Sequence, residues 1–380
     1  MEAQPLNNAV VLIAVRLAMR CSEEDSRLVL SQNNLAGAML SNKQGDCIYN
    51  PDGGRLEANI RFMAAFLQPN ARSQRLEKMA AMQHGKWNVV VFEGNEPTSI
   101  ESSAPWIRLN SLTVDGGPGV GAPSIWLGEP VAIQGPIGVC FDKRRGRHLL
   151  AVMQKPEQGL APLFNALLVL LAHYKPGEAR FSILNVLDND SPWSGWPGRI
   201  KEVFGSAQLI ESIGREQLSE FLPALAEDVK KSAPSSKASL PRFLFVMGLQ
   251  LARELRSREA YSPREPDIKT IDGAFVYVLK EGAEHRVHVL AWCDLLSNVA
   301  RTGRTMLEEF GVRLAGEMTQ SDSAACVGTL DAARLRKNNR AVLYDEAKPG
   351  TAQILRPYSL PSFALFERVA ARQMERNRGV

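Results

Sequence analysis

Short apolar runs alternate with segments of helical periodicity along most of the chain. The apolar runs at residues 149–153 and 243–247 predict buried strands, and residues 180–187, 287–292 and 312–318 predict further strands. The intervening helical patterns occupy residues 160–173, 211–230 and 295–310, with a last amphipathic helix at 363–378. Short apolar strands that alternate with helices are typical of a mainly parallel sheet covered on both faces.

The segments that precede this alternation are more varied. Residues 125–133 predict an extended strand, and residues 142–148 predict a basic turn. Residues 72–82 predict a short charged helix, and residues 87–92 predict a β-rich strand. The glycine-rich residues 116–121 lack a following Lys-Ser/Thr pair and a helix start, so we interpret them as a linker rather than a phosphate loop.

The chain contains an internal repeat. Val-Arg-Leu-Ala begins at Val15 and again at Val312, 297 positions later, and Asp-Ser follows at the same spacing in both copies. We expect an alanine-rich helical stretch after each copy, at residues 35–40 and 330–335, and then a short strand, at residues 47–50 and 342–345. The common order of these elements argues against chance similarity.

The distance between the two copies suits a whole domain rather than a solenoid repeat. We therefore interpret residues 1–68 as the C-terminal remnant of one α/β module and residues 116–380 as a second, more complete module. Residues 69–115 are interpreted as a linker with a small α/β segment. This division makes the chain a fragment, a split gene product or the end of a tandem protein.

Composition narrows the class of protein. Hydrophobic residues make up 45% and charged residues 23% of the 380 residues, which excludes a disordered, collagen-like or disulfide-scaffold chain. The formal net charge is +4, so the total charge neither demands nor excludes nucleic acid. The five cysteines are dispersed without a C-x-x-C pair, which favours a reducing, cytoplasmic environment and predicts no zinc site. The apolar runs are too short to cross a bilayer.

Four stretches together resemble the FtsK/SpoIIIE family of DNA-pumping motors, which includes the EccC-type ATPases of type VII secretion. The stretches are residues 146–153 with the helix after them, residues 243–250, residues 281–294, and the repeated segment at residues 312–323 and 15–26. They are similar to the family's phosphate-loop strand, Walker B strand, sensor strand and closing strand, in that order. The resemblance implies a RecA-like P-loop NTPase fold, with ATP and Mg²⁺ as cofactors.

The residues at the phosphate-loop position depart from the family's pattern. A working loop reads G-x-x-x-x-G-K-[ST], in which backbone amides hold the phosphates, Lys meets the terminal oxygens and the hydroxyl binds Mg²⁺. The eight corresponding residues have Gly159 in place of the Lys and Leu160 in place of the hydroxyl, and Pro156 removes one amide. They are Met153, Gln154, Lys155, Pro156, Glu157, Gln158, Gly159 and Leu160.

The two other nucleotide-binding positions are also altered. The Walker B strand ends in Gly248 and Leu249 without the carboxylate that binds the metal, and the sensor position holds Cys293 and Asp294. Charge neutralisation, metal binding and water positioning are the basis of phosphoryl transfer. We therefore predict no catalytic residue and a degenerate pocket that does not hydrolyse ATP.

Several other polar groups have competing interpretations. Arg16, Arg27 and Arg313 are candidate trans-acting arginines for a neighbouring subunit, although a salt-bridged strand end is equally consistent with the sequence. The basic run 143–147 could contact phosphates, but a solvated turn is the commoner meaning of such a run. His285 and His288 point to opposite faces of a strand and make a poor metal pair.

The resemblance implies a non-catalytic module of a DNA-translocating or substrate-pumping motor. It also implies a homo- or hetero-oligomeric ring with other FtsK-like modules and allows DNA as a partner. Two alternatives stay open: an active, atypical DNA-stimulated ATPase that uses Lys155, and a component of a type VII-like secretion motor in which the degenerate pocket binds a peptide.

Overall fold

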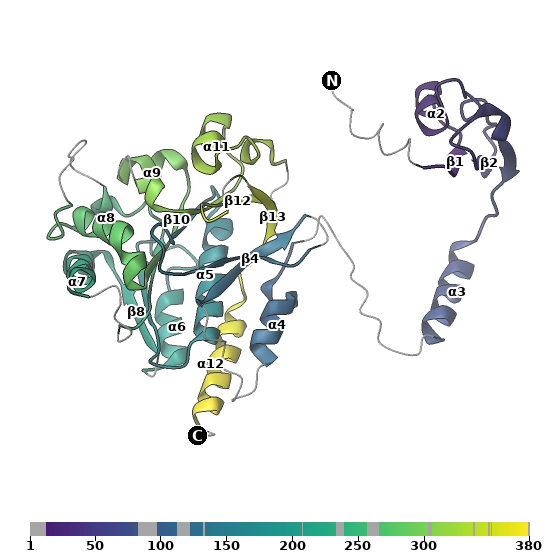
Figure 1. Cartoon of the computed structure of the whole chain (residues 1–380). Helices are drawn as coiled ribbons and strands as arrows, with labels where there is room; N and C mark the ends of the chain where they lie inside the picture. The colour runs from purple at the N-terminus through teal and green to yellow at the C-terminus, as the bar shows by residue number, and fades with distance from the viewer. Residues whose placement is uncertain are drawn as a thin grey trace. The chain divides into compact units, whose positions relative to one another are not determined.

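The protein is described by a computed structural model in which two compact units follow one another along the chain, residues 1–90 and 91–380 (Figure 1). The described residues are 13–82, 97–111, 122–131, 134–206, 208–232, 239–256, 266–302, 306–336, 339–348, 350 and 352–378. The strand expected at residues 87–92 and the linker expected at residues 116–121 lie outside them.

The first unit is built on a small antiparallel sheet. Its strands β1 (Arg16–Met19), β2 (Asp46–Asn50) and β3 (Ile60–Met63) pair in that order. Helix α2 (Glu23–Val29) follows β1, and helix α3 (Pro69–Ala81) follows β3. A small core of Ala18, Leu30, Leu40 and Ile48 forms on one face of the sheet. The expected charged helix at residues 72–82 is therefore confirmed as part of α3.

The second unit is built on a sheet of ten strands, in the order β5-β4-β13-β12-β11-β6-β10-β9-β7-β8. From β5 to β11 in this order, each strand pairs antiparallel with the next. From β11 to β8, each strand pairs in parallel with the next. Their bounds are β4 Ser124–Pro130, β5 Ile137–Cys140, β6 Leu149–Val152, β7 Arg180–Asn185, β8 Leu209–Ile213, β9 Arg242–Met247, β10 Val287–Cys293, β11 Val312–Ala315, β12 Ala341–Asp345 and β13 Gln353–Pro357.

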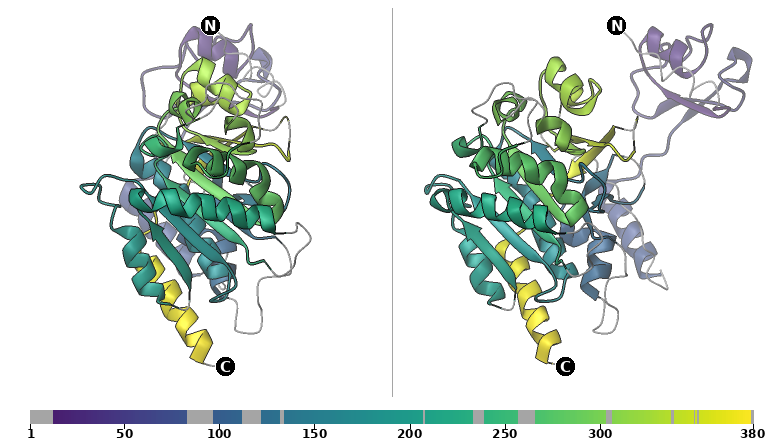
Figure 2. Two further views of the ribbon diagram at one scale, coloured as in Figure 1. Left: turned by 90° about the vertical axis from the view of Figure 1, so that its left-hand side faces the viewer. Right: turned by 60° about the vertical axis from the view of Figure 1, so that its left-hand side comes forward.

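Helices cover both faces of this sheet (Figure 1). One face packs against α4 (Ala104–Ser111), α5 (Pro156–His173), α6 (Trp196–Phe204) and α12 (Phe363–Arg378). The other face packs against α7 (Leu218–Lys231), α8 (Ile271–Glu281), α9 (Leu296–Thr302), α10 (Met306–Glu309) and α11 (Gln320–Val327). Figure 2 shows α12 running beside α6 and projecting beyond the sheet.

Burial explains why the apolar runs form central strands. Every residue of β6 and β10 is buried, because both faces of each strand are covered by helices. Helix α5 is buried around most of its circumference, as an apolar helix between a sheet and further helices must be. The mainly parallel α/β sheet with helices on both faces, expected from the sequence, is therefore confirmed.

Four expected elements differ from the structure. Glu211–Ile213 belongs to strand β8, and the helix begins only at Leu218. The helix expected at residues 295–310 is two helices, α9 and α10. The helical stretch expected at residues 35–40 consists of turns, and residues 330–335 contain only a 3₁₀ turn, Ala332–Arg334. The helices of the two repeats instead follow their first strands directly, because Ser22 and Thr319 cap them there.

The repeat is preserved in hydrogen bonding as well as in sequence. Ser22 and Thr319 are N-caps with the same backbone angles, φ −67° and ψ 163°, and each accepts a hydrogen bond from the amide three residues later. Arg16 Nε donates to the Ile13 carbonyl, and Arg313 Nε donates to the Phe310 carbonyl. In each of these bonds, the donor and the acceptor of the second copy lie 297 positions after their counterparts in the first copy.

Candidate functional site

The connection between β6 and α5 is where a P-loop fold would hold phosphates. It consists of only three residues, Met153 to Lys155, because α5 begins at Pro156. The other five residues of the expected eight-residue loop, from Pro156 to Leu160, therefore lie in the helix. The Gly159 amide already donates to the Lys155 carbonyl. A three-residue connection leaves too little extended backbone to wrap a phosphate group.

The first turn of α5 carries its own negative charge. Lys155 is the N-cap, but its side chain makes no capping hydrogen bond, and Pro156 offers no amide hydrogen. Glu157 lies in the first turn, where a carboxylate interacts favourably with the positive end of the helix dipole. Glu157 therefore supplies the negative charge that a bound phosphate would otherwise bring to this helix end.

Trp292 fills the space above this turn. It is the penultimate residue of β10 and is 2% exposed. Its Nε1 donates a hydrogen bond of 2.8 Å to the Met153 carbonyl. A Cβ atom placed on Gly159 would lie 2.0 Å from both Cδ1 and Nε1 of the indole. Gly159 is therefore required by the ring that packs against it.

Trp292 is the residue that sequence reasoning missed at this site. A tryptophan at the end of a buried strand reads as ordinary core, and Gly159 reads as the position where a P-loop lysine is lost. Only the adjacency of β6 and β10 in the sheet brings these two residues into contact. A bulky residue at the sensor strand together with a glycine in the helix is the signal that could have revealed the contact.

The Walker B and sensor positions are used for structure. Gly248 has φ +99°, a left-handed conformation that favours glycine, and the buried Leu249 donates its amide to the Trp292 carbonyl at 2.7 Å. Burial raises the pKa of the Cys293 thiol to about 12, so it is protonated at neutral pH. Asp294 Oδ1 accepts from the Leu295 amide and from Asn298 Nδ2, both at 2.7 Å.

These residues do not fit a magnesium triphosphate. Gly159 and Leu160 stand at the positions where the lysine and the hydroxyl would be needed, and Leu249 follows β9 where a metal-binding carboxylate would be needed. Lys155 is exposed. Within the described residues, no group of three His, Cys, Asp or Glu side chains is arranged to hold a metal ion.

The three candidate trans-acting arginines occupy different environments. Arg313 donates to the Phe310 and Cys326 carbonyls and lies over the Tyr344 ring, 5.0 Å from its centroid. Arg16 makes the equivalent bonds to Ile13 and Val29. Both guanidinium groups therefore join the end of a helix to the strand before it. Arg27 is half exposed and lies 4.0 Å from Glu23.

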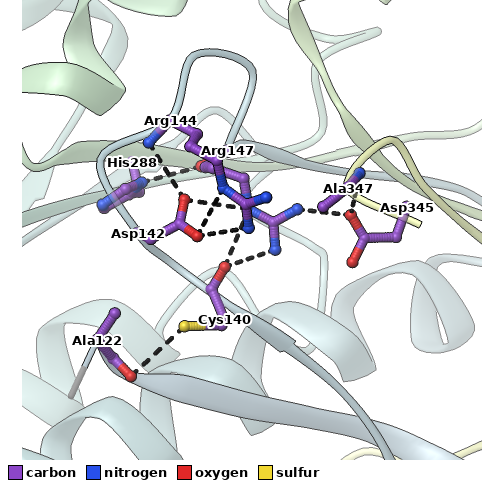
Figure 3. Close-up of polar contacts among 8 residues, drawn as sticks. All are labelled: Ala122, Cys140, Asp142, Arg144, Arg147, His288, Asp345 and Ala347. Atoms are coloured by element: carbon purple, nitrogen blue, oxygen red, sulfur yellow. Dashed lines mark hydrogen bonds and ion pairs between the residues drawn. The ribbon is translucent and has the colours of Figure 1, made fainter. Parts of the chain in front are cut away.

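The basic turn between β5 and β6 is held by acidic partners (Figure 3). Arg147 Nη1 contacts Asp345 Oδ1 at 2.5 Å, and both side chains are buried. Arg147 also donates to the Cys140 carbonyl through Nε and Nη2. Arg144 pairs with Asp142, and Arg145 pairs with Glu309. Much of the positive charge of this turn is therefore neutralised within the protein rather than directed at a phosphate backbone.

Two buried histidines lie beside this turn. His148 Nδ1 accepts from the Val289 amide and its Nε2 contacts the Leu279 carbonyl, so the ring is neutral with its hydrogen on Nε2. His288 Nδ1 contacts the Arg147 carbonyl. Burial lowers the pKa of His148 to about 3 and that of His288 to about 4. His285 instead contacts Ser232 Oγ. His285 and His288 therefore do not form a metal pair.

Comparison with solved structures shows which known proteins have a similar fold. The chain is similar in structure to the cytoplasmic domain of the type VII secretion ATPase EccC of Thermomonospora curvata, with 15% identity and a TM-score of 0.58, over 100% of this chain and 45% of that one. It is also similar to the pCW3 conjugation coupling protein TcpA, solved with ATPγS, with 10% identity and a TM-score of 0.50, over 69% of this chain and 72% of that one.

A third similar structure is that of ATPases 2 and 3 of EssC from Geobacillus thermodenitrificans, with 10% identity and a TM-score of 0.50, over 69% of this chain and 51% of that one.

No family model and no curated protein sequence matches the chain. The resemblance to FtsK/SpoIIIE-type ATPases and the P-loop NTPase fold are thus confirmed in structure. The chain spans less than half the length of the EccC structure. In its described parts, no helix has the length and apolar character needed to span a membrane.

Proposed function

We propose that residues 91–380 form a P-loop-fold module that does not hydrolyse ATP and that acts as an assembly element of a motor ATPase. The observation that carries this proposal is the packing of Trp292 against Gly159, with its Nε1 bonded to the Met153 carbonyl. The indole packs against the first turn of α5, which carries the position where the family's lysine would stand.

The chemistry of phosphoryl transfer supports the same conclusion. Catalysis of this reaction depends on positioning and on neutralising charge at the phosphate oxygens. The carboxyl ends of β6, β9 and β10 provide neither, since they present Met153, Leu249 and Trp292. The sheet and the α5 core are nevertheless fully packed. A fold that keeps its scaffold and loses its nucleotide chemistry is suited to binding neighbouring modules.

The proposed setting is a cytoplasmic oligomer in which other FtsK-like modules hydrolyse ATP. A protein-secretion motor is favoured over a DNA motor for two reasons. The EccC structure is matched over the whole chain, whereas the conjugation protein is matched over 69%. In addition, Arg144, Arg145 and Arg147 of the basic turn are engaged by carboxylates, which reduces their value for binding a nucleic acid backbone.

A titration with a fluorescent ATP analogue, with and without Mg²⁺, tests the proposal directly. We expect no saturable binding below millimolar concentrations and no ATP turnover above background. Lys155→Ala should change neither result, because Lys155 is exposed. Micromolar, Mg²⁺-dependent binding would overturn the proposal, and its loss in Lys155→Ala would establish the active, atypical ATPase instead.

A second titration distinguishes the cargo. Duplex DNA binding through phosphate contacts would weaken steeply with salt, and this can be measured by fluorescence anisotropy between 50 and 200 mM salt, roughly the range over which such contacts are lost. We expect no such salt-dependent binding. Submicromolar DNA binding with a steep salt dependence would assign the module to a DNA motor.

A further inference from the structure

The second unit has a hollow of about 170 Å³ between α7 and the amino ends of its parallel strands. The residues of β7, β8, β9 and α7 that give it its polar character and its aromatic wall are Arg180, Ser182, Glu211, Phe221, Asp228 and Arg242. Nucleotides bind to α/β folds at the opposite, carboxyl ends of the strands. The hollow is therefore separate from the degenerate nucleotide position.

Three polar side chains of this hollow lie on a sheet face that is otherwise apolar. Because side chains alternate along a strand, Arg180 and Ser182 share the face of Leu184, and Glu211 shares the face of Ile213. Leu184 and Ile213 belong to the core beneath α7. A strand face that is fully covered by helices continues with apolar residues. The change to polar residues marks the place where the hollow opens to solvent.

The charges of the hollow are only partly paired with one another. Arg242 Nη1 donates to Asp228 Oδ2 at 2.9 Å, so these two side chains neutralise each other. Among the residues that the structure describes, Arg180 and Glu211 form no ion pair. Ser182 lies opposite Glu211 in the register, and Arg180 lies two residues before Ser182, which separates the Cα atoms of Arg180 and Glu211 by roughly 8 Å. One positive and one negative group thus line the same space without meeting.

The inner wall of the hollow is apolar. Leu225 of α7, Leu244 of β9 and Val287 of β10 are buried there, and Phe221 of α7 is half-buried. An apolar cavity of about 150 Å³ can hold a benzene molecule. The hollow therefore has room for one aliphatic or aromatic side chain behind its charged rim.

We infer that this hollow binds a free α-amino acid with an apolar side chain. The carboxylate of the ligand pairs with the Arg180 guanidinium, its ammonium group pairs with the Glu211 carboxylate, and its side chain packs on Leu225 and Leu244. Charge-assisted hydrogen bonds of both signs select a molecule that carries both charges on one carbon atom. A phosphate or a simple carboxylic acid would be repelled by Glu211, and a simple amine would be repelled by Arg180.

This inference goes beyond the function proposed above and does not depend on it. Nucleotide binding and ATP turnover report on the carboxyl ends of β6, β9 and β10, whereas amino-acid binding reports on the amino ends of β7 and β9 and on β8. The two properties are measured with different ligands, so either proposal can fail without the other.

Ligand-observed NMR with the full chain tests the inference, with L-leucine and L-phenylalanine as probes. We expect saturable binding of at least one probe with a dissociation constant of about 1 mM or lower, the range open to a ligand of this size. N-acetyl-L-leucine lacks the ammonium group and L-leucinamide lacks the carboxylate. The corresponding derivatives of the bound probe should each bind roughly tenfold more weakly, because each loses a hydrogen bond between charged groups. No saturable binding of either probe, or equal binding of one of these derivatives, would overturn the inference.

Two matched pairs of variants locate the site. Arg180→Gln and Glu211→Gln should each weaken binding roughly tenfold, because each removes one of the two charge-assisted contacts. Arg253→Gln and Glu220→Gln remove the same charges outside the hollow and should leave the affinity unchanged. All four residues are exposed, and circular dichroism should show that the variants remain folded. Unchanged affinity in Arg180→Gln or Glu211→Gln, or an equal loss in the control variants, would assign the binding elsewhere and overturn the inference.

Discussion

The two copies of the repeat have nearly the same local structure and opposite surroundings. In both, an arginine joins its strand to the end of the following helix, and a Ser or Thr caps that helix. Yet Leu17 of the first copy is largely exposed, and Leu314 of the second is fully buried. The comparison teaches that a short segment encodes its own hydrogen bonds, whereas burial depends on which other elements are present.

The second difference concerns charge. In the second copy, Asp345 forms a buried ion pair with Arg147 of the basic turn. The second strand of the first copy, β2, ends in the neutral Asn50, whose Oδ1 accepts the Asp52 amide, just as Asp345 Oδ1 at the end of β12 accepts the Ala347 amide. The backbone function of the side chain is thus common to both copies. The carboxylate is required only where a buried guanidinium faces it.

The largest expected effect on stability comes from placing a charge at Leu314, compared with the same change at its counterpart Leu17. Leu314→Asp should lower the free energy of unfolding of the second unit by more than about 4 kcal/mol, because it buries an unpaired carboxylate. Leu17→Asp should change that of the first unit by less than about 0.5 kcal/mol, because the side chain is in solvent. Hydrogen exchange followed by mass spectrometry reports on each unit separately.

A variant that is easier to fold provides a check on this comparison. Leu314→Ala should destabilise the second unit by about 3 kcal/mol through the cavity that it leaves, and Leu17→Ala should have almost no effect. Equal losses at the two positions would show that Leu17 is buried in solution and would contradict the exposed face of the first unit.

The next effect concerns pH. His148 and His288 are neutral when folded, with pKa values lowered to about 3 and about 4, whereas an unfolded histidine titrates near 6.5. Protonation therefore favours the unfolded second unit, whose stability is full above pH 6.5 and falls as the pH approaches these lowered values. At pH 5 the loss should be about 2 kcal/mol for each histidine relative to pH 7.

The first unit should respond differently to acid. Residues 13–82 contain no histidine. The Arg61 guanidinium, hydrogen-bonded to Asp46, lowers the pKa of that carboxyl. The contribution of this pair to stability is therefore present above about pH 4 and is lost only below it.

Urea unfolding at pH 7 and pH 5, monitored by hydrogen exchange, measures the stability of both units. His288→Gln should remove part of the pH dependence of the second unit, and an unchanged slope would refute this explanation.

The smallest effect should be the same in both copies. Ser22 and Thr319 accept hydrogen bonds of 3.0 and 3.2 Å from the amides of Asp25 and Asp322. Replacing either residue with alanine should cost about 1 kcal/mol, because one helix-terminal amide loses its partner. Exchange rates of the α2 and α11 amides provide the measurement. A large effect in one copy alone would mean that the caps are not equivalent.

Sequence reasoning predicted the central part of the fold well, for a physical reason. Strands such as β6, β9 and β10 lie in the middle of a covered sheet, so their residues must be continuously apolar. It was less successful at the edges, where β5 and β13 carry mixed sequences and where Glu211–Ile213 was assigned to a helix rather than to β8. Pairing with a neighbouring strand outweighed local propensity there.

For the candidate site, the sequence alone revealed which groups are missing. Without coordinates it can be seen that Gly159 and Leu160 replace the lysine and the hydroxyl, and that Gly248–Leu249 lacks the acid. The structure adds that the loop is reduced to three residues and that α5 begins at Pro156. Helix start and loop length depend on packing against the sheet, which a single loop sequence does not encode.

By itself the sequence determined the repeat, the buried strands and the loss of phosphate-binding chemistry, because each of these follows from residue types at short spacing. Only the tertiary structure decided that Trp292 lies on Gly159 and that Leu17 lies open while Leu314 lies in a core. Contacts of this kind join residues far apart in the chain, and the order of strands in the sheet brings them together or leaves them apart.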